Sequence, residues 1–126
     1  MVPGKVINHS PASSEKYIGS PSIVILDKGK YLVAHDLFGP GSAYQNTFIF
    51  KTNDFGQNWE QLTQIKGQWW SNLFIHQENI YIFGVDKRDG KIAIRRSSDE
   101  GRTWTNPESK DKGILTETEG YHCAPM

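Results

Sequence analysis

Several side chains of this sequence could take part in acid–base chemistry or hold a polar ligand. His35 and Asp36 are adjacent, and an imidazole beside a carboxylate can move a proton. We therefore expect Asp36 and His35 to be the catalytic candidates, with Asp36 as the acid or base. Charged groups and aromatic rings can hold a polar ligand through ion pairs and stacking. On that basis the predicted substrate-binding residues are Trp70, Asp86, Arg88, Arg96, Tyr121 and His122.

Several of these candidates also have an ordinary structural interpretation. An aspartate at the end of a strand, such as Asp36, often only starts a turn. The stretch Asp86–Gly90 can equally be a solvated hairpin whose charges cancel. Trp69 and Trp70 point to opposite sides of a regular strand, so one is expected in the core and the other on the surface. Both interpretations stay open at this point.

The charge balance and hydropathy of the chain exclude several classes of protein. Fourteen Lys and Arg residues stand against fourteen Asp and Glu residues among 126, which gives a formal net charge of zero. A general nucleic-acid binder carries a basic excess, and no apolar run approaches the roughly 20 residues of a membrane span. Cys123 is the single cysteine and cannot form an intramolecular disulfide. Because no cluster has metal-ligand spacing and no Gly-rich phosphate loop is present, we expect no metal and no cofactor.

The elements that must position these residues are short strands. Apolar residues occur in short β-branched or aromatic clusters separated by Gly, Asn, Asp and Pro, and helical periodicity is nearly absent. The predicted fold is all-β with antiparallel hairpins. The predicted strands span Ser22–Leu26, Tyr31–His35, Thr47–Lys51, Trp59–Ile65, Ser71–His76, Ile80–Val85, Lys91–Arg96 and Trp104–Thr105.

An octapeptide motif occurs twice, at positions 52–59 (the first box) and 97–104 (the second box). Both copies read hydroxyl-x-Asp-x-Gly-x-x-Trp. The hydroxyl and the carboxylate can bond turn N–H groups, the glycine allows a backbone that a Cβ would obstruct, and the tryptophan can bury its ring between sheets. We therefore expect a structural role for the box residues Thr52, Asp54, Gly56, Trp59, Ser97, Asp99, Gly101 and Trp104.

The spacing of the two boxes predicts repeated units. A period of 40–50 residues with four strands in each unit is typical of a β-propeller blade. The predicted blades span about 17–66 and 68–112, and a third starts at about 120–126. About two and a half blades are fewer than the four or more that close a propeller. We expect the remaining blades to come from a longer chain or from further copies of this one.

The two boxes resemble the Asp-box, or BNR, repeat of sialidase-like six-bladed propellers. The longer stretches 17–39, 70–84 and 92–104 are similar to bacterial proteins of that family, so the chain resembles part of such a propeller. The resemblance implies that substrate binds on the rim opposite to the boxes. It also implies a periplasmic or secreted location.

The resemblance also implies where sialidase residues should stand. Gly19 occupies the position of the first sialidase arginine and Phe38 that of the second, and the loop 39–46 holds no carboxylate. We therefore do not expect sialic-acid hydrolysis. The expected function is glycan recognition within a glycoside hydrolase whose site differs from that of a sialidase. The alternatives are a carbohydrate- or protein-binding propeller module without catalysis, and a scaffold. The expected partner is a carbohydrate. We expect no nucleic-acid partner and no membrane-spanning segment.

Overall fold

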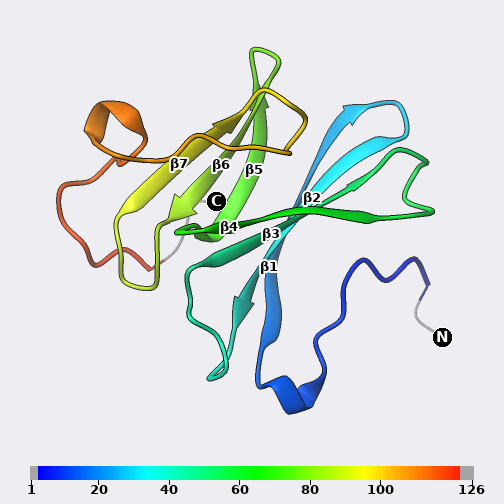
Figure 1. Cartoon of the computed structure of the whole chain (residues 1–126), viewed down its shortest axis with the longest axis horizontal. Helices are drawn as coiled ribbons and strands as arrows, with labels where there is room; N and C mark the ends of the chain where they lie inside the picture. Colours follow the sequence, from blue (N-terminus) through cyan, green and yellow to red (C-terminus); the bar gives the residue numbers. More distant parts are fainter. Residues whose placement is uncertain (1–2, 123–126) are drawn as a thin grey trace.

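The chain folds into two antiparallel sheets. The computed structural model describes residues 3–122, and within them neither sheet closes on itself (Figure 1). The first sheet has the order β1-β2-β3-β4 and the second the order β5-β6-β7. The strands are β1 (Tyr17–Asp27), β2 (Lys30–Phe38), β3 (Asn46–Thr52), β4 (Glu60–Lys66), β5 (Trp69–His76), β6 (Asn79–Val85) and β7 (Ile92–Ser97). Two 3-10 turns complete the described chain, η1 (Ala12–Ser14) and η2 (Lys110–Lys112). The all-β prediction is confirmed.

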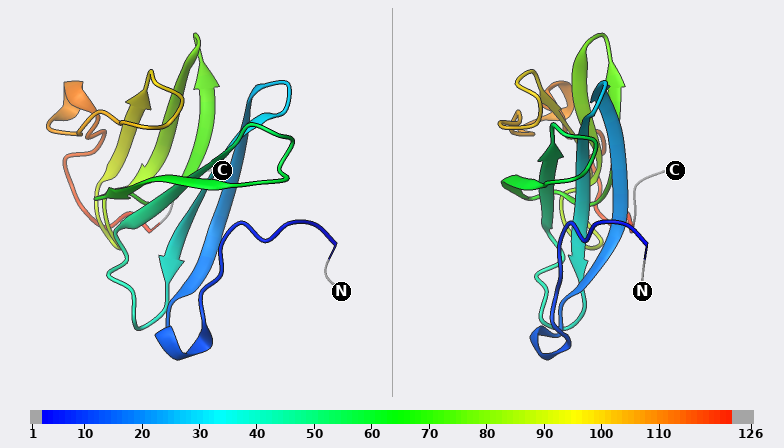
Figure 2. Two further views of the ribbon diagram at one scale, coloured as in Figure 1. Left: turned by 45° about the vertical axis from the view of Figure 1, so that its right-hand side comes forward. Right: turned by 90° about the vertical axis from the view of Figure 1, so that its right-hand side faces the viewer.

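The core lies between the two sheets. In Figure 2 the long strands β1 and β5 run next to each other, and β5 also contacts β2. Burying a large aliphatic side chain contributes about 1.5–3 kcal/mol, so these contacts hold the sheets together. The buried cluster takes alternate residues of strands from both sheets, namely Leu32, Ala34, Ile49, Ile65, Leu73, Ile80 and Ile82.

The eighth predicted strand, at Trp104–Thr105, is not formed. The Thr105 N–H donates to the Arg96 carbonyl at 2.9 Å, but the Arg96 N–H donates to the Thr105 side-chain hydroxyl instead of to its backbone. Pro107, two residues on, has no N–H with which to extend a ladder. The second sheet therefore has three strands, where four were expected.

The third predicted unit lies mostly beyond the described residues, since Cys123–Met126 fall outside them. Tyr121 makes an isolated bridge with Gly90, and the Gly120 N–H donates to the Asp89 carbonyl at 2.9 Å. This segment therefore pairs with the β6–β7 turn. Among residues 3–122 no helix is long and apolar enough to cross a membrane.

Candidate functional site

The first box closes on itself through its own polar side chains. The Thr52 hydroxyl donates to Asp54 Oδ1 at 2.7 Å and accepts the Gly56 N–H at 3.0 Å. Asp54 Oδ1 also accepts the Asn58 N–H at 2.9 Å, and the Trp59 indole N–H donates to the Gly56 carbonyl at 3.0 Å. The hydrogen bonds from Asn58 and Thr52 lower the pKa of Asp54 to about 2, so the carboxylate stays ionised.

The second box repeats this set of hydrogen bonds. The Ser97 hydroxyl donates to Asp99 Oδ1 at 2.8 Å and accepts the Gly101 N–H at 2.9 Å. Asp99 Oδ1 accepts the Thr103 N–H at 2.9 Å, and the Trp104 indole donates to the Gly101 carbonyl at 3.0 Å. Hydrogen bonds from Thr103 lower the pKa of Asp99 as well. Both aspartates thus bind their own loops, which leaves them poorly placed to act on a ligand.

The two boxes lie at the same edge of the molecule. The Phe55 N–H donates to the Gly29 carbonyl at 2.9 Å, which ties the first box to the β1–β2 turn. The Lys51 ammonium, at the end of β3, forms an ion pair with Glu100 of the second box. The loops at the other ends of these strands, 39–45 and 86–91, therefore form the opposite rim.

Asp36 is fully buried between the sheets, with 0% of its surface exposed. One carboxyl oxygen contacts the Thr47 hydroxyl, and the other accepts the Ser71 N–H at 3.1 Å. The Thr47 hydroxyl also lies 2.9 Å from the Gln68 carbonyl. Burial raises the pKa of Asp36 to about 7, although its hydrogen bonds with Thr47 and Ser71 act in the opposite direction.

The Thr47 hydroxyl has one proton but two neighbouring oxygens, Asp36 Oδ1 and the Gln68 carbonyl, so it can donate to only one of them. This indicates how the Asp36 carboxyl is protonated and hydrogen-bonded. When Asp36 is protonated, it donates to Thr47, and Thr47 donates to the Gln68 carbonyl. Every polar atom of this chain of groups then has a partner. Asp36 thus joins β2 and β3 to β5 and the link before it, and no solvent reaches it for catalysis.

His35 lies on the other face of β2 from Asp36, so the two side chains do not form a pair. The buried imidazole stacks between Phe48 and Phe50, with ring centroids 5.3 and 5.4 Å away. Its Nε2 lies 2.8 Å from Asn8 Nδ2 of the N-terminal segment. Burial lowers the pKa of His35, although a backbone hydrogen bond with Asp36 acts in the opposite direction. The expected acid–base pair is therefore not assembled in this structure.

The rim opposite to the boxes gathers a row of aromatic rings, which we call the aromatic row: Phe38, Tyr44, Trp69 and Trp70. The Trp69 ring lies 4.8 Å from Phe38, 5.5 Å from Tyr44 and 5.4 Å from Trp70 between centroids. The Arg88 guanidinium stands 5.1 Å from the centroid of the Tyr44 ring, a cation–π distance. Trp69 is buried, whereas Trp70 is 40% exposed. The aromatic row thus runs from the sheet interface to the surface.

A bulge in β5 brings the two tryptophan rings together. The register shifts between Trp69 and Asn72, and Trp70 has a φ of +46°, in the left-handed region that non-glycine residues rarely occupy. Regular alternation would send consecutive rings to opposite faces. The prediction that one tryptophan is buried and the other exposed is confirmed, but their direct contact was not expected.

Charged groups of the β6–β7 loop lie beside the aromatic row. His122 Nδ1 lies 2.7 Å from one carboxylate oxygen of Asp89, and Arg88 Nε lies 3.8 Å from the other. The Asp86 carboxylate accepts the Lys91 N–H at 2.8 Å and so closes its own loop. The structure therefore brings Trp70, Arg88, Tyr121 and His122 to one rim and uses Asp86 mainly in the turn.

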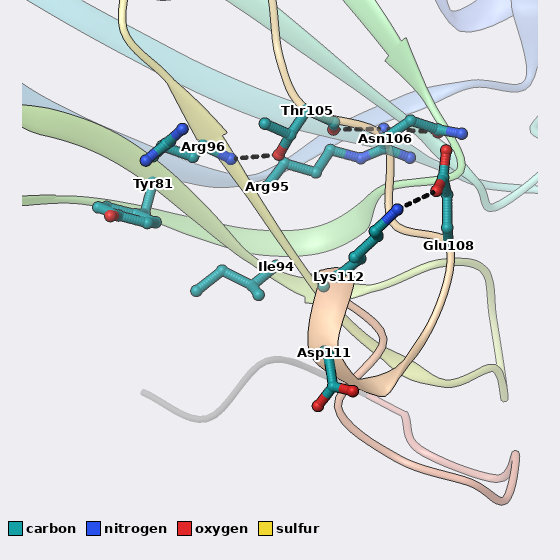
Figure 3. Close-up of a pocket in the computed structure, with 10 residues that line it drawn as sticks. Tyr81, Ile94, Arg95, Arg96, Thr105, Asn106, Glu108, Asp111 and Lys112 are labelled. Atoms are coloured by element: carbon teal, nitrogen blue, oxygen red, sulfur yellow. Dashed lines mark hydrogen bonds and ion pairs between the residues drawn. The ribbon is translucent and has the colours of Figure 1, made fainter.

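Arg96 lies away from this rim. It borders a hollow of about 460 Å³ near the second box, where Tyr81, Thr105 and the ion pair of Lys112 with Glu108 also line the wall (Figure 3). Figure 3 shows its guanidinium near the Tyr81 ring, at the end of the hollow away from Lys112 and Glu108. The structure therefore separates Arg96 from the other predicted binding residues.

Two residues that were not predicted as site residues, Arg95 and Tyr44, organise this part of the structure. Arg95 is buried, and its five N–H groups donate to Gln68, Lys66, Gly67, Thr105 and Asn106 at 3.0–3.3 Å. Tyr44 bridges Trp69 and Arg88 from a loop. The alternation of Arg95 and Arg96 along a strand signalled that one is buried, without showing which. For Tyr44 the sequence carried no signal beyond an aromatic residue in a polar loop.

Within residues 3–122, no group of three or more His, Cys, Asp or Glu side chains could hold a metal ion. No family model, no curated protein and no solved structure matches this chain.

Proposed function

We propose that this chain is part of a β-propeller that recognises glycans at the rim opposite to its boxes. The observation that carries the proposal is the aromatic row, which ends at the exposed Trp70 and is flanked by Arg88, Asp89 and His122. Sugar rings present C–H faces that pack on aromatic planes, and their hydroxyls bond charged side chains. The rim offers both kinds of contact side by side.

The backbone of Trp70 supports the same proposal. A bulge and a left-handed φ at a non-glycine residue carry a cost of order 1–3 kcal/mol and are enriched at functional sites. Here they set an indole that is 40% exposed in edge-on contact with the rings of Trp69 and Phe38. A ligand that stacks on Trp70 meets a surface that is already ordered.

The blade assignment rests on the two boxes. Both boxes share the hydrogen bonds of the hydroxyl, the aspartate Oδ1, the glycine and the tryptophan, and each follows the third strand of its sheet. Repetition of one local structure in two adjacent sheets is typical of a propeller. We therefore treat each sheet as one blade, with the second blade three-stranded.

The test is binding of the full chain to a panel of neutral and acidic oligosaccharides, measured by calorimetry and ligand-detected NMR. Trp70→Ala is expected to weaken binding about tenfold or more, which corresponds to about 1.4 kcal/mol. Phe74→Ala is the matched control, because Phe74 has similar exposure, 39%, and lies outside the aromatic row. Absence of binding across the panel, or equal losses in both variants, would contradict the proposal.

Glycoside hydrolysis is the second candidate, and the Asp89–His122 contact at the rim favours it. An exposed carboxylate beside an imidazole can serve acid–base chemistry without the buried Asp36. Product release from the same panel tests it. Turnover that disappears in Asp89→Asn while binding persists would support an enzyme, and turnover lost in Asp36→Asn alone would show that Asp36 becomes accessible.

A further inference from the structure

The contact between the two sheets has a defined pattern at the box edge. The Lys51 ammonium of the first sheet pairs with Glu100 of the second box. Leu32, the cross-strand neighbour of Lys51, packs so closely on Gly101 that a Cβ there would lie 2.8 Å from the leucine side chain. Trp104 packs against the same buried cluster. A cation, an apolar side chain and a glycine thus meet at this edge.

The outer face of the second sheet, which is turned away from the first sheet, repeats the half of this pattern that consists of the cation and its cross-strand neighbour. Aligning the boxes places Arg96 where Lys51 stands in the first sheet. Tyr81 then takes the place of Leu32, because Tyr81 is the cross-strand neighbour of Arg96. Beside them Phe74 is exposed and stacks on Tyr81 at 5.2 Å. None of the ion pairs in the described part of the chain includes Arg96.

The outer face of the first sheet, which is turned away from the second sheet, repeats the half that consists of the Glu100 position and the glycine. Phe55 stands where Glu100 stands in the second box, and 61% of its surface is exposed. Gly56 corresponds to Gly101, and the atoms nearest to a Cβ there all belong to its own Trp59. Ile23 and Ile25 of β1 are also exposed, at 60% and 67%. This face therefore presents an open glycine, a ring and aliphatic side chains.

We propose that two copies of this chain associate head to tail, with the second sheet of one copy packed on the first sheet of the other. Arg96 of one copy then lies over the Phe55 ring of the second copy, at the position that Lys51 and Glu100 occupy within one chain. A guanidinium over an aromatic face is attracted by the negative face of the ring. Tyr81 of one copy faces Gly56 of the second, and the exposed aliphatic and aromatic side chains cover one another.

The N-terminal segment limits the contact to the box half of the first sheet. This segment lies on the side of the sheet that faces away from the second sheet (Figure 1), and Asn8 contacts His35 there. His35, Val33 and Phe50 are buried, whereas Ile23, Ile25 and Phe55 are open. The open side chains are those that the repeated pattern requires. Because two different faces meet, the association is heterologous and can continue into a ring.

The test is the mass of the full chain in solution, measured by sedimentation velocity and light scattering over a series of rising concentrations. We expect a mass above that of one chain. Arg96→Glu is expected to weaken association about tenfold or more, since it removes the cation–π contact and introduces a buried charge. Adding Phe55→Lys to Arg96→Glu is expected to restore association, because the pair then reproduces the Lys51–Glu100 contact with its charges exchanged.

Lys16→Glu is the control, since it makes the same charge change at an exposed residue just before β1, at the rim opposite to the boxes, and should leave the mass unchanged. Arg96→Gln supplies a second, uncharged variant, and circular dichroism of every variant verifies folding. A single-chain mass at every concentration, an unaltered mass in both Arg96 variants, or failure of Phe55→Lys to restore association would overturn the proposal. Glycan binding lies at the opposite rim, so either proposal can fail without the other.

Discussion

The buried Asp36 makes the free energy of unfolding depend on pH in a way that one substitution can isolate. Burial raises its pKa in the folded protein to about 7, far above the ordinary value of 3.8. The folded state therefore holds the proton more tightly than the unfolded chain. This contribution to stability is fully present below about pH 4 and is lost as the pH rises through about 7.

Asp36→Asn removes this titration while it keeps the shape of the group. The amide oxygen can accept the Ser71 N–H, and the amide nitrogen can donate to the Thr47 hydroxyl, as the protonated acid does. Each pH unit between the two pKa values changes the stability of the parent protein by about 1.4 kcal/mol. From pH 5 to pH 8 the variant should therefore gain about 3 kcal/mol relative to the parent.

Urea unfolding followed by tryptophan fluorescence at several pH values measures this difference. Asp54→Asn is the control, because the pKa of Asp54 is about 2 and its carboxylate stays ionised throughout the range. Its effect on stability should therefore be the same at every pH tested. If Asp36→Asn changed the unfolding free energy equally at pH 5 and pH 8, the inference that this carboxyl is buried and protonated would be refuted.

Two further substitutions test how the sheets are joined. Arg95→Met should lower the unfolding free energy by about 3 kcal/mol, since it strips buried carbonyls of their donors. Arg95→Lys should recover only part of this loss. Denaturant unfolding measures both variants, and the absence of any loss in Arg95→Met would contradict the reasoning. Gly101→Ala should cost about 1 kcal/mol more than Gly56→Ala. Both glycines have φ near +85°, but only a Cβ at Gly101 would meet Leu32, and equal melting temperatures would count against this packing.

The sequence by itself was sufficient for the boxes and most of the strands. Within a box the hydroxyl, the carboxylate and the glycine bond one another across two to four residues, so their types and spacing specify the loop. Strands β2, β3 and β6 carry dense clusters of β-branched and aromatic residues between turn residues. Such local patterns predict local structure, whatever the remainder of the chain does.

The candidate site, in contrast, depended on contacts between distant residues. Asp36 is buried because Ser71 and Gln68, more than 30 residues later, close over it, and His35 beside it is covered by Asn8 from the N-terminal segment. The aromatic row forms because a bulge at Trp70 breaks the regular alternation of β5.

The same dependence explains which features the sequence could not supply. The missing eighth strand follows from the Thr105 hydroxyl taking the Arg96 N–H, a competition between side chain and backbone that composition does not reveal. Which of Arg95 and Arg96 is buried was settled by the carbonyl groups of the link between the sheets. Sequence specified the local loops and strands because their hydrogen bonds span a few residues. Only the packing of one sheet on the other decided which polar side chains face solvent, because that depends on groups far apart in the chain.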